Sequence, residues 1–461
     1  MKRRGNTRLN KTFSNISRSN IGIIKKLFRI LGWLLPGLLI KRWMLTSAIG
    51  FLTAMIGIVI WTELRPIVWL INLVSWTLTS FSTVPPLLGP FILIIGLLLL
   101  GIGQNRSINS IKRALAPEKD TFLVDALRVK SKLSKGPNIV AIGGGTGLST
   151  LLKGLKTYSS NISAIVTVSD DGGSSGILRK QLGVQPPGDI RNCLAALSNE
   201  EPTLTRLFQY RFSGGSGLEG HSFGNLFLSA LTTITGSLEK AVQASSKVLA
   251  VQGQVIPATS IDVMLWAELE DGEKIFGESL ISQSDKPIAR IGCVPENPTA
   301  LPTAIEAIKQ SDLIILGPGS LYTSLLPNLL IPDIVEALIN SNAPKIYISN
   351  LMTQPGETDG LGVYEHIKSI EKQLSIFGVN KRIFNSILSQ IEFEESPLVD
   401  YYRSRGAEPV LCDKNKLISE GYYVLQAPLY AKKIRPTLRH DPRRLSRAVM
   451  YIYRKIKKSN Q

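Results

Sequence analysis

Residues 138–148 read NIVAIGGGTGL, and this stretch decides the fold of the larger part of the chain. An apolar, β-branched run at 138–142 predicts a strand, and apolar residues at helical spacing predict a helix over 148–158. The glycines between them let backbone N–H groups approach a phosphate, which the positive end of the following helix attracts. The stretch therefore predicts a phosphate-binding loop between a strand and a helix. Its candidate ligand-binding residues are Gly143, Gly144, Gly145, Thr146 and Gly147.

The loop alone is not specific, because a tight turn from a strand to a helix has the same composition. It is not a Walker loop, since no Gly-Lys-Ser/Thr follows it. Leu148 stands where the dinucleotide fingerprint has its third glycine. This mismatch argues against a dinucleotide oxidoreductase.

A second polar glycine loop follows the next predicted strand, 162–169. Asp170 lies 23 residues beyond Gly147, about where a nucleotide-binding sheet places the acid that binds a ribose hydroxyl. Asp170 and Asp171 together are alternatively a Mg²⁺ site that bridges phosphates, or simply part of a turn before a helix. The candidate residues of this loop are Asp170, Asp171, Gly172, Gly173 and Ser174.

Further candidates lie at later strand ends and helix starts, where ligands of open α/β sheets bind. Backbone amides of a loop after the strand 313–316 would contact a second phosphate or a sugar, and Asn350 follows the strand 345–349. Asp189 is a ready helix N-cap, and His221 lies between glycines at a helix start, where it would bind phosphate or transfer a proton. The candidates in these segments are Gly317, Pro318, Gly319, Ser320, Thr323, Asn350, Asp189, Asn192, His221 and Asn225, with Tyr402 and Arg439 for base stacking or phosphate pairing.

From residue 137 onward, short β-branched runs alternate with helical ones. This alternation predicts an α/β domain over 137–461, with a Rossmann-like parallel sheet and helices on both of its faces. Residues 262–277 break the alternation and predict a β-hairpin that turns at Asp271 and Gly272.

The N-terminal third predicts an α-helical transmembrane anchor, over 43–105. Residues 43–62 contain no charge and are long enough as a helix to cross a hydrocarbon core of roughly 30 Å. Residues 87–103 (LLGPFILIIGLLLLGIG) are the second predicted span. The apolar but interrupted run 66–81 carries Trp69 and Trp76 and is expected to lie in the outer interface.

Basic residues flank both predicted spans and set their direction. The arm 1–42 contains 11 Lys and Arg and no Asp or Glu, so the positive-inside rule places it in the cytoplasm. The linker 106–136 is also basic, and two spans then return the C-terminal domain to the cytoplasm. We therefore predict a two-span membrane protein that contacts lipid through residues 1–105.

The formal charge of +18 comes mostly from this region: residues 1–135 hold 20 Lys and Arg against 4 Asp and Glu. The remaining domain is close to neutral, and this argues against a nucleic-acid partner. Cys193, Cys293 and Cys412 are far apart, so neither a zinc site nor a disulfide framework is expected. A reducing compartment fits this pattern.

Eight ordered motifs resemble the CofD-like superfamily and, most closely, its gluconeogenesis factor family of the YvcK type. They cover roughly residues 138–445 and read GGGTGLSTLLKGLK, VSDDGGSSG, PPGDIRNCLAAL, YRF, GHSFGNLFL, LGPGSLYTSLLPNLL, NLMTQPGET and RHDP. The resemblance implies a Rossmann-like domain that binds a nucleotide-sugar, with UDP-N-acetylglucosamine as the favoured ligand. It also implies a role in controlling cell shape and envelope synthesis during growth on gluconeogenic carbon sources, without a defined reaction.

A sister branch with a similar glycine loop transfers a phospholactyl group to a deazaflavin precursor with Mg²⁺. The chain has SDDGG at 169–173 where that branch has an Asn-Thr-Gly-Asp-Asp type of loop, and this departure argues against transfer chemistry. If the chain is a transferase of phosphorus-containing groups, the candidate catalytic residues are Asp170, Asp171 and His221, with Mg²⁺ as the cofactor. Envelope-synthesis proteins and a second copy of the chain remain candidate partners.

Overall fold

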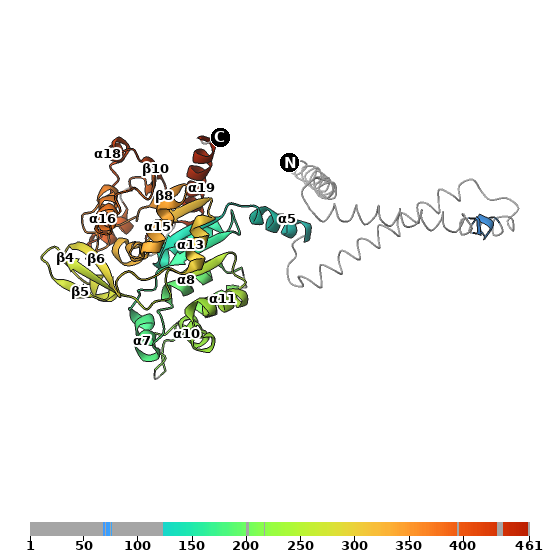
Figure 1. The fold of residues 1–461 in the computed structure, drawn as a ribbon, viewed down its shortest axis with the longest axis horizontal. Helices are drawn as coiled ribbons and strands as arrows, with labels where there is room; N and C mark the ends of the chain where they lie inside the picture. The colour runs from blue at the N-terminus through green and yellow to red at the C-terminus, as the bar shows by residue number, and fades with distance from the viewer. Residues whose placement is uncertain are drawn as a thin grey trace, which may run out of the picture. The chain divides into compact units, whose positions relative to one another are not determined.

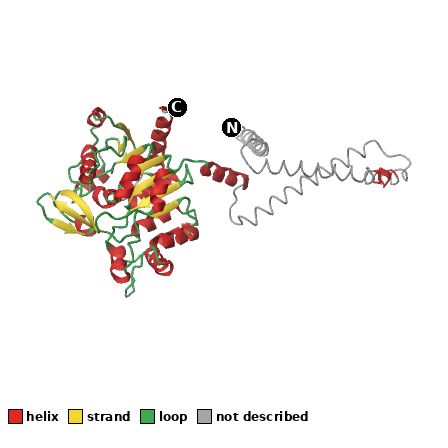
Figure 2. Cartoon of the chain, viewed as in Figure 1, coloured by secondary structure: helices red, strands yellow, loops and turns green. Residues whose placement is uncertain are grey.

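The computed structural model describes residues 68, 69, 71–73, 75, 123–199, 202–215, 217–393, 396–430 and 437–459. The chain divides into two compact units, Met1–Ser131 and Lys132–Gln461, and the division falls inside the predicted linker (Figures 1 and 2). The predicted arm and both predicted spans, 43–62 and 87–103, lie outside the described residues. Within the predicted interfacial run, residues 68, 69, 71–73 and 75 are helical and exposed.

In the part of the chain that the structure describes, no single helix is both long and apolar enough to cross a membrane. One bent pair passes that test by length and composition, Leu321–Leu329 with Pro332–Asn340, and the two segments meet at 76°. Leu321, Leu329 and Leu338 in this pair are buried in the hydrophobic core of the second unit.

The second unit is built on a seven-stranded parallel sheet with the order β10-β9-β8-β7-β1-β2-β3, flanked by helices (Figure 1). The predicted α/β fold with a Rossmann-like parallel sheet is thereby confirmed. Every residue of the central strand β7 and of its neighbour β1 is buried, as expected when helices cover a parallel sheet on both faces. The strands are β1 (Ile139–Gly143), β2 (Ile162–Val166), β3 (Gln254–Pro257), β7 (Leu313–Leu316), β8 (Lys345–Ile348), β9 (Ser386–Gln390) and β10 (Tyr423–Ala427).

The helices of the second unit pack in groups. α6 packs against both α8 and α19, and α13 packs against α15. At Gly154 of α6, an added Cβ would collide with the carbonyl oxygen of Pro442, so α6 and α19 approach each other at backbone distance. The helices are α5 (Leu123–Ser134), α6 (Gly145–Leu155), α7 (Gly173–Leu182), α8 (Gly188–Leu197), α9 (Pro202–Gln209), α10 (Phe223–Thr235), α11 (Leu238–Val248), α12 (Glu278–Ile281), α13 (Pro302–Lys309), η2 (Leu321–Leu325), α14 (Leu326–Leu329), α15 (Pro332–Asn340), α16 (Val363–Ile376), α17 (Pro397–Arg403), α18 (Lys414–Ser419) and α19 (Pro442–Ser459).

The predicted hairpin is present within a separate three-stranded antiparallel sheet of order β5-β4-β6 (Figure 2). Its strands are β4 (Met264–Leu269), β5 (Lys274–Phe276) and β6 (Ile288–Val294). The turn contains Gly272 at φ +87°, a conformation that glycine adopts without strain. Trp266 on β4 lies directly over Gly292 on β6, where no larger residue would fit.

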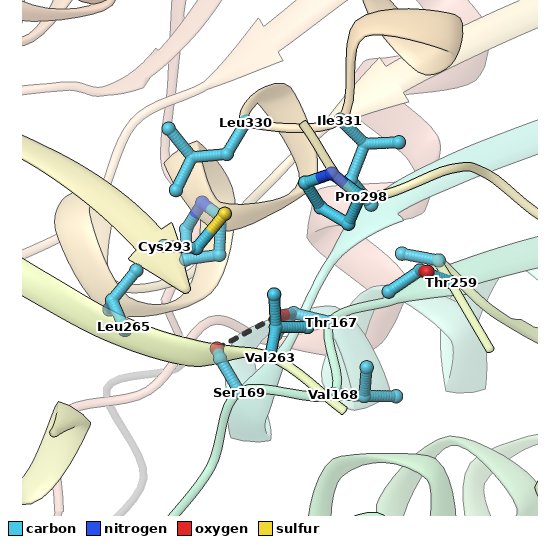
Figure 3. Close-up of a pocket in the computed structure, with 12 residues that line it drawn as sticks. Thr167, Val168, Ser169, Thr259, Val263, Leu265, Cys293, Pro298, Leu330 and Ile331 are labelled. Atoms are coloured by element: carbon cyan, nitrogen blue, oxygen red, sulfur yellow. Dashed lines mark hydrogen bonds between the residues drawn. The ribbon is translucent and has the colours of Figure 1, made fainter. Parts of the chain in front are cut away.

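The small sheet packs against the segment after β2 around a narrow cavity (Figure 3). The cavity measures about 10 Å³, room for about one water molecule, so it is a packing defect and not a ligand site. Thr167 and Ser169 share a hydrogen bond of 2.9 Å at its floor. Cys293 also lines the cavity; it is a buried free thiol whose Sγ donates a 3.3 Å hydrogen bond to the carbonyl oxygen of Pro295.

Candidate functional site

The loops after β1 and β7 meet at the carboxyl edge of the sheet. A Cβ at Gly147 would collide with the carbonyl oxygen of Pro318, so these two loops touch through their backbones. The amide of Gly319 donates a 3.2 Å hydrogen bond to Oδ1 of Asn350, which follows β8. β1 and β7 are neighbours although they are far apart in sequence, and such a switch point is where open α/β sheets bind ligands.

A pocket of about 380 Å³ opens at this switch point. Its volume lies within the range of small-molecule sites. Ten of the predicted ligand residues line it: Gly145, Thr146, Gly147, Pro318, Gly319, Ser320, Thr323, Asn350, Tyr402 and Arg439. The other predicted residues of the glycine loops do not line it: Gly143, Gly144, Asp170, Asp171, Gly172, Gly173, Ser174 and Gly317.

The glycine loop runs directly into α6, which begins at Gly145, earlier than the sequence pattern predicts. The N-cap residue Gly144 has no side chain to satisfy the first amides, so the positive end of the helix is open to an anion. One of these amides is already used: the backbone of Gly145 hydrogen-bonds to the carboxyl group of Asp189. Asp189 therefore touches the predicted phosphate loop. Its predicted role as the N-cap of α8 is wrong, because the helix begins at Gly188 and its N-cap is Pro187.

Five carboxyl groups gather beside the pocket. Burial and the nearby charge of Asp170 raise the pKa of Asp189 to about 6. Burial, followed by the charges of Asp170, Asp189, Asp171 and Glu357, raises the pKa of Glu278 to about 9. Burial also raises the pKa of Glu357. At neutral pH Glu278 is thus protonated, because its surroundings already hold too much negative charge.

The two adjacent aspartates after β2 have different surroundings. Oδ1 of Asp170 accepts a 2.9 Å hydrogen bond from the amide of Gly172, and its Oδ2 faces Gly188 at the start of α8. Oδ1 of Asp171 accepts hydrogen bonds from the amide and the hydroxyl of Ser279, at 2.8 and 2.6 Å. Asp171 therefore fastens the small sheet and α12 to the loop, whereas Asp170 belongs to the acidic group with Asp189.

Among the residues that the structure describes, no group of three or more His, Cys, Asp or Glu side chains is placed to hold a metal ion by itself. Mg²⁺ in nucleotide sites is usually held by one or two carboxylates together with phosphate oxygens and water. Asp170 and Asp189 match that donor set, since both are acidic and interact with each other beside the phosphate loop. Asp171 matches it less well because its Oδ1 accepts two hydrogen bonds from Ser279, whereas Oδ1 of Asp170 accepts one, from Gly172.

A separate group of side chains contains four of the predicted residues that do not line the pocket. Ser174 Oγ lies 2.9 Å from Nδ1 of His221 and accepts a 3.1 Å hydrogen bond from Nδ2 of Asn225. Oδ1 of Asn192 accepts a 3.0 Å hydrogen bond from Arg191, whose guanidinium is largely buried. Ser174, His221 and Asn225 thus connect α7 to α10 and the segment before it, and Arg191 connects α8 to α10 by donating to the N-cap residue Ser222.

A family model described as 2-phospho-L-lactate transferase CofD matches residues 139–430. The chain belongs to the CofD family. Among its CofD relatives, a Bacillus subtilis protein named gluconeogenesis factor is 46% identical over 314 residues, which cover 68% of this chain and 97% of the relative. A Nostoc sp. protein, provisionally given the same name, is 52% identical to this chain over 423 residues. The match covers 91% of this chain and 92% of the Nostoc protein. The predicted membership of the YvcK type is confirmed.

A protein from Bacillus halodurans with a crystal structure is 46% identical to this chain, with a TM-score of 0.65. The match covers 68% of this chain and all of that one. A complete relative thus corresponds in length to the second unit alone. The second unit, Lys132–Gln461, is therefore expected to fold by itself.

Three titratable residues that matter to the site were not among the predicted ligand residues: Glu278 and His440 line the pocket, and Glu357 lies behind it, bonded to lining residues. Glu357 accepts hydrogen bonds from Ser320, Thr323 (3.1 Å) and Gln354 (2.6 Å), and its position in the motif NLMTQPGET is the signal that would have found it. Glu278 begins α12, between strands β5 and β6 of the small sheet, and carries no sequence signal. His440 lines the pocket next to Arg439, and burial lowers its pKa to about 4, so its ring is neutral at physiological pH.

Proposed function

We propose that the protein binds a nucleotide-sugar, with UDP-N-acetylglucosamine as the favoured ligand. We propose further that it acts as a regulator of cell shape during gluconeogenic growth. The observation that carries the proposal is the pocket at the switch point between β1 and β7. Backbone amides of two touching glycine loops line it, and these amides suit a diphosphate. Family membership supports the regulatory role, since the relatives bear the name gluconeogenesis factor.

The proposed roles follow from where each residue lies. The backbone amides of Thr146, Gly147 and Ser320 would hold the diphosphate, since Pro318 has no N–H and the amides of Gly145 and Gly319 are bonded to Asp189 and Asn350. Asn350 would position the sugar or the base with the amide group left free by its bond to the loop after β7. Tyr402 and Arg439 enter the pocket from a different part of the chain, where a stacked ring and a charge would complete the site.

The acidic group argues that a cation accompanies the ligand. Arg439 is the one lysine or arginine among the described residues that line the pocket, whereas Glu278 is present there and Asp170 and Asp189 are adjacent. A diphosphate brought to this place would be repelled unless positive charge came with it. Mg²⁺, held by Asp170, Asp189 and the phosphates, would supply that charge.

Isothermal titration of the second unit with UDP-N-acetylglucosamine, with and without Mg²⁺, tests the proposal. Gly147→Ala should weaken binding by about tenfold or more, since the added methyl group separates the two loops. Gly214→Ala is the matched control, because a Cβ there meets nothing within 4 Å. Absence of heat at millimolar ligand, or equal binding by both variants, would refute the assignment of this pocket.

A second candidate function is Mg²⁺-dependent transfer of a phosphorus-containing group. The pairing of Asp170 with Asp189 beside the phosphate loop favours it, together with the description of the matching family model. His221 is hydrogen-bonded to Ser174 and does not line the pocket, so His440 is the better placed histidine. Product detected by phosphorus NMR with a nucleotide donor, and lost in Asp170→Asn, would establish an enzyme, whereas binding without turnover favours the regulator.

We also propose that the predicted spans 43–62 and 87–103 anchor the domain to the membrane, with both ends in the cytoplasm. The proposal rests on the charge-free length of these segments and on their basic flanks. It would place the ligand domain near envelope-synthesis proteins as candidate partners. Two reporters fused after Lys135 test this topology, one active only in the cytoplasm and one active only outside it. We expect activity from the first reporter alone. Activity from the second reporter alone would exclude the two-span topology.

A further inference from the structure

The C-terminal helix α19, Pro442–Ser459, has two sharply different faces. Leu445, Val449 and Ile452 are fully buried and contribute to the hydrophobic core. The opposite face is exposed and basic: the helix contains seven Lys and Arg residues and no Asp or Glu. The domain as a whole is close to neutral, so this concentration of one sign is local and needs its own explanation.

The exposed residues form a continuous stripe along the helix. Arg443, Arg447, Tyr451, Arg454 and Lys458 are all exposed and follow one another at intervals of three or four residues, which places them on one side of an α-helix. At 1.5 Å per residue the stripe extends over roughly 25 Å. Arg444 and Lys455 border it on one side and are also exposed. A flat, extended partner would meet all of these side chains together.

The stripe is not neutralised within the protein. No carboxylate in the described ranges pairs with a basic side chain of α19. Arg444 donates to the carbonyl oxygen of Tyr430, and Lys455 lies over the ring of Tyr423, so the two border residues keep their charge. Tyr451, in the middle of the stripe, is 54% exposed.

The end of α19 lies at the edge where the sheet begins. Nζ of Lys455 is 3.3 Å from the hydroxyl of Tyr423, the first residue of β10. Because all seven strands are parallel, this is also the edge where the chain enters β1 at Ile139. The segment that leads into β1 comes from the predicted membrane anchor. The pocket lies at the opposite, carboxyl edge.

We propose that the exposed stripe of α19 docks on the surface of an anionic lipid bilayer. Basic side chains along a flat helix face match a layer of negative headgroups, and each is worth about 1 kcal/mol at such a surface. A tyrosine among them suits the interface between headgroups and acyl chains. A nucleic acid fits less well, since the rest of the domain offers no excess of positive charge to follow a second strand or groove.

The experiment uses the second unit without residues 1–131, so that the predicted spans do not contribute to membrane binding. It does not depend on the nucleotide-sugar. The second unit should co-sediment with vesicles of phosphatidylcholine containing about 30% phosphatidylglycerol and not with vesicles of phosphatidylcholine alone. Replacing Arg443, Arg447 and Arg454 by Gln should lower the partition coefficient by about 100-fold, from about fivefold per charge. The matched control replaces Arg206, Lys240 and Lys247 by Gln, on α9 and α11, and should bind as the parent does.

A Tyr451→Trp variant reports the orientation, because Trp266 is the other tryptophan of this unit. Its emission should be quenched by brominated phosphatidylglycerol, while the parent's emission is not. Binding to neutral vesicles, equal losses in both triple variants, or absence of quenching would overturn the proposal. Retention on DNA or RNA but not on vesicles would instead assign the stripe to nucleic acid. Thermal unfolding of each variant shows that the loss does not come from misfolding.

Discussion

Replacement of Glu278 by Gln should stabilise the second unit, and increasingly so as the pH rises. The folded-state pKa of this carboxyl group is raised to about 9 by burial and by Asp170, Asp189, Asp171 and Glu357. Between the ordinary pKa of glutamate and about 9, the folded state therefore binds a proton that the unfolded state has released. The contribution of this proton to the stability of the folded domain is fully present below the ordinary pKa of glutamate. It is lost as the pH rises from that value through about 9.

The slope is about 1.4 kcal/mol per pH unit for one proton. Two units, from pH 6.5 to pH 8.5, then cost the parent domain about 3 kcal/mol that the Gln variant keeps, or a difference in Tm of about 4 °C for a domain of this size. This range lies above the pKa of about 6 of Asp189, so that group contributes little to the change.

Differential scanning calorimetry at several pH values measures the gap in Tm between the Glu278→Gln variant and the parent. Glu336→Gln, at an exposed position on α15, is the control and should show a constant gap. A gap for Glu278→Gln that stays the same from pH 6.5 to pH 8.5 would mean that Glu278 is ionised in the folded domain. That result would contradict the inference that burial and the neighbouring carboxylates keep Glu278 protonated beside the pocket.

Three other substitutions test the site. Gly147→Ala should lower the free energy of unfolding by about 2 kcal/mol, because its methyl group meets the carbonyl oxygen of Pro318; chemical denaturation measures this. Asn350→Ala removes the acceptor for an amide of the loop after β7 and should cost about 1 kcal/mol of stability and weaken nucleotide-sugar binding, measured by titration. Asp171→Ala should cost about 2 kcal/mol and speed hydrogen exchange in α12, where the amide of Ser279 loses its partner; unchanged exchange would contradict the fastening role.

The sequence pattern predicts those parts of the fold that depend on neighbours in the chain. The strand 138–142 and the glycine loop after it are visible because alternation of short apolar runs and turn residues is a local signal. The hairpin at Gly272 is visible for the same reason. Residues of the pocket that directly follow strands, such as Asn350, could be expected since parallel strands end at one edge.

Contacts between distant segments could not be predicted in this way. Asp171 is bonded to Ser279. Glu278, which completes the acidic group, lies between two strands of a small sheet whose packing no local pattern specifies. His221 looks like a ligand residue because it stands between glycines, yet the fold turns it to Ser174. The residues adjacent in the sequence do not distinguish a side chain that faces the pocket from one that faces a neighbouring helix.

Helix α6 is held at both of its ends by backbone contacts, with Pro318 at Gly147 and with Pro442 at Gly154. A change of ligand preference cannot therefore be engineered by moving this helix, since any shift would break one junction or the other. The side of the pocket formed after β8, by Asn350, Met352 and Gln354, depends on side chains instead. Variation among related proteins that recognise different ligands is expected to concentrate there, while α6 stays constant.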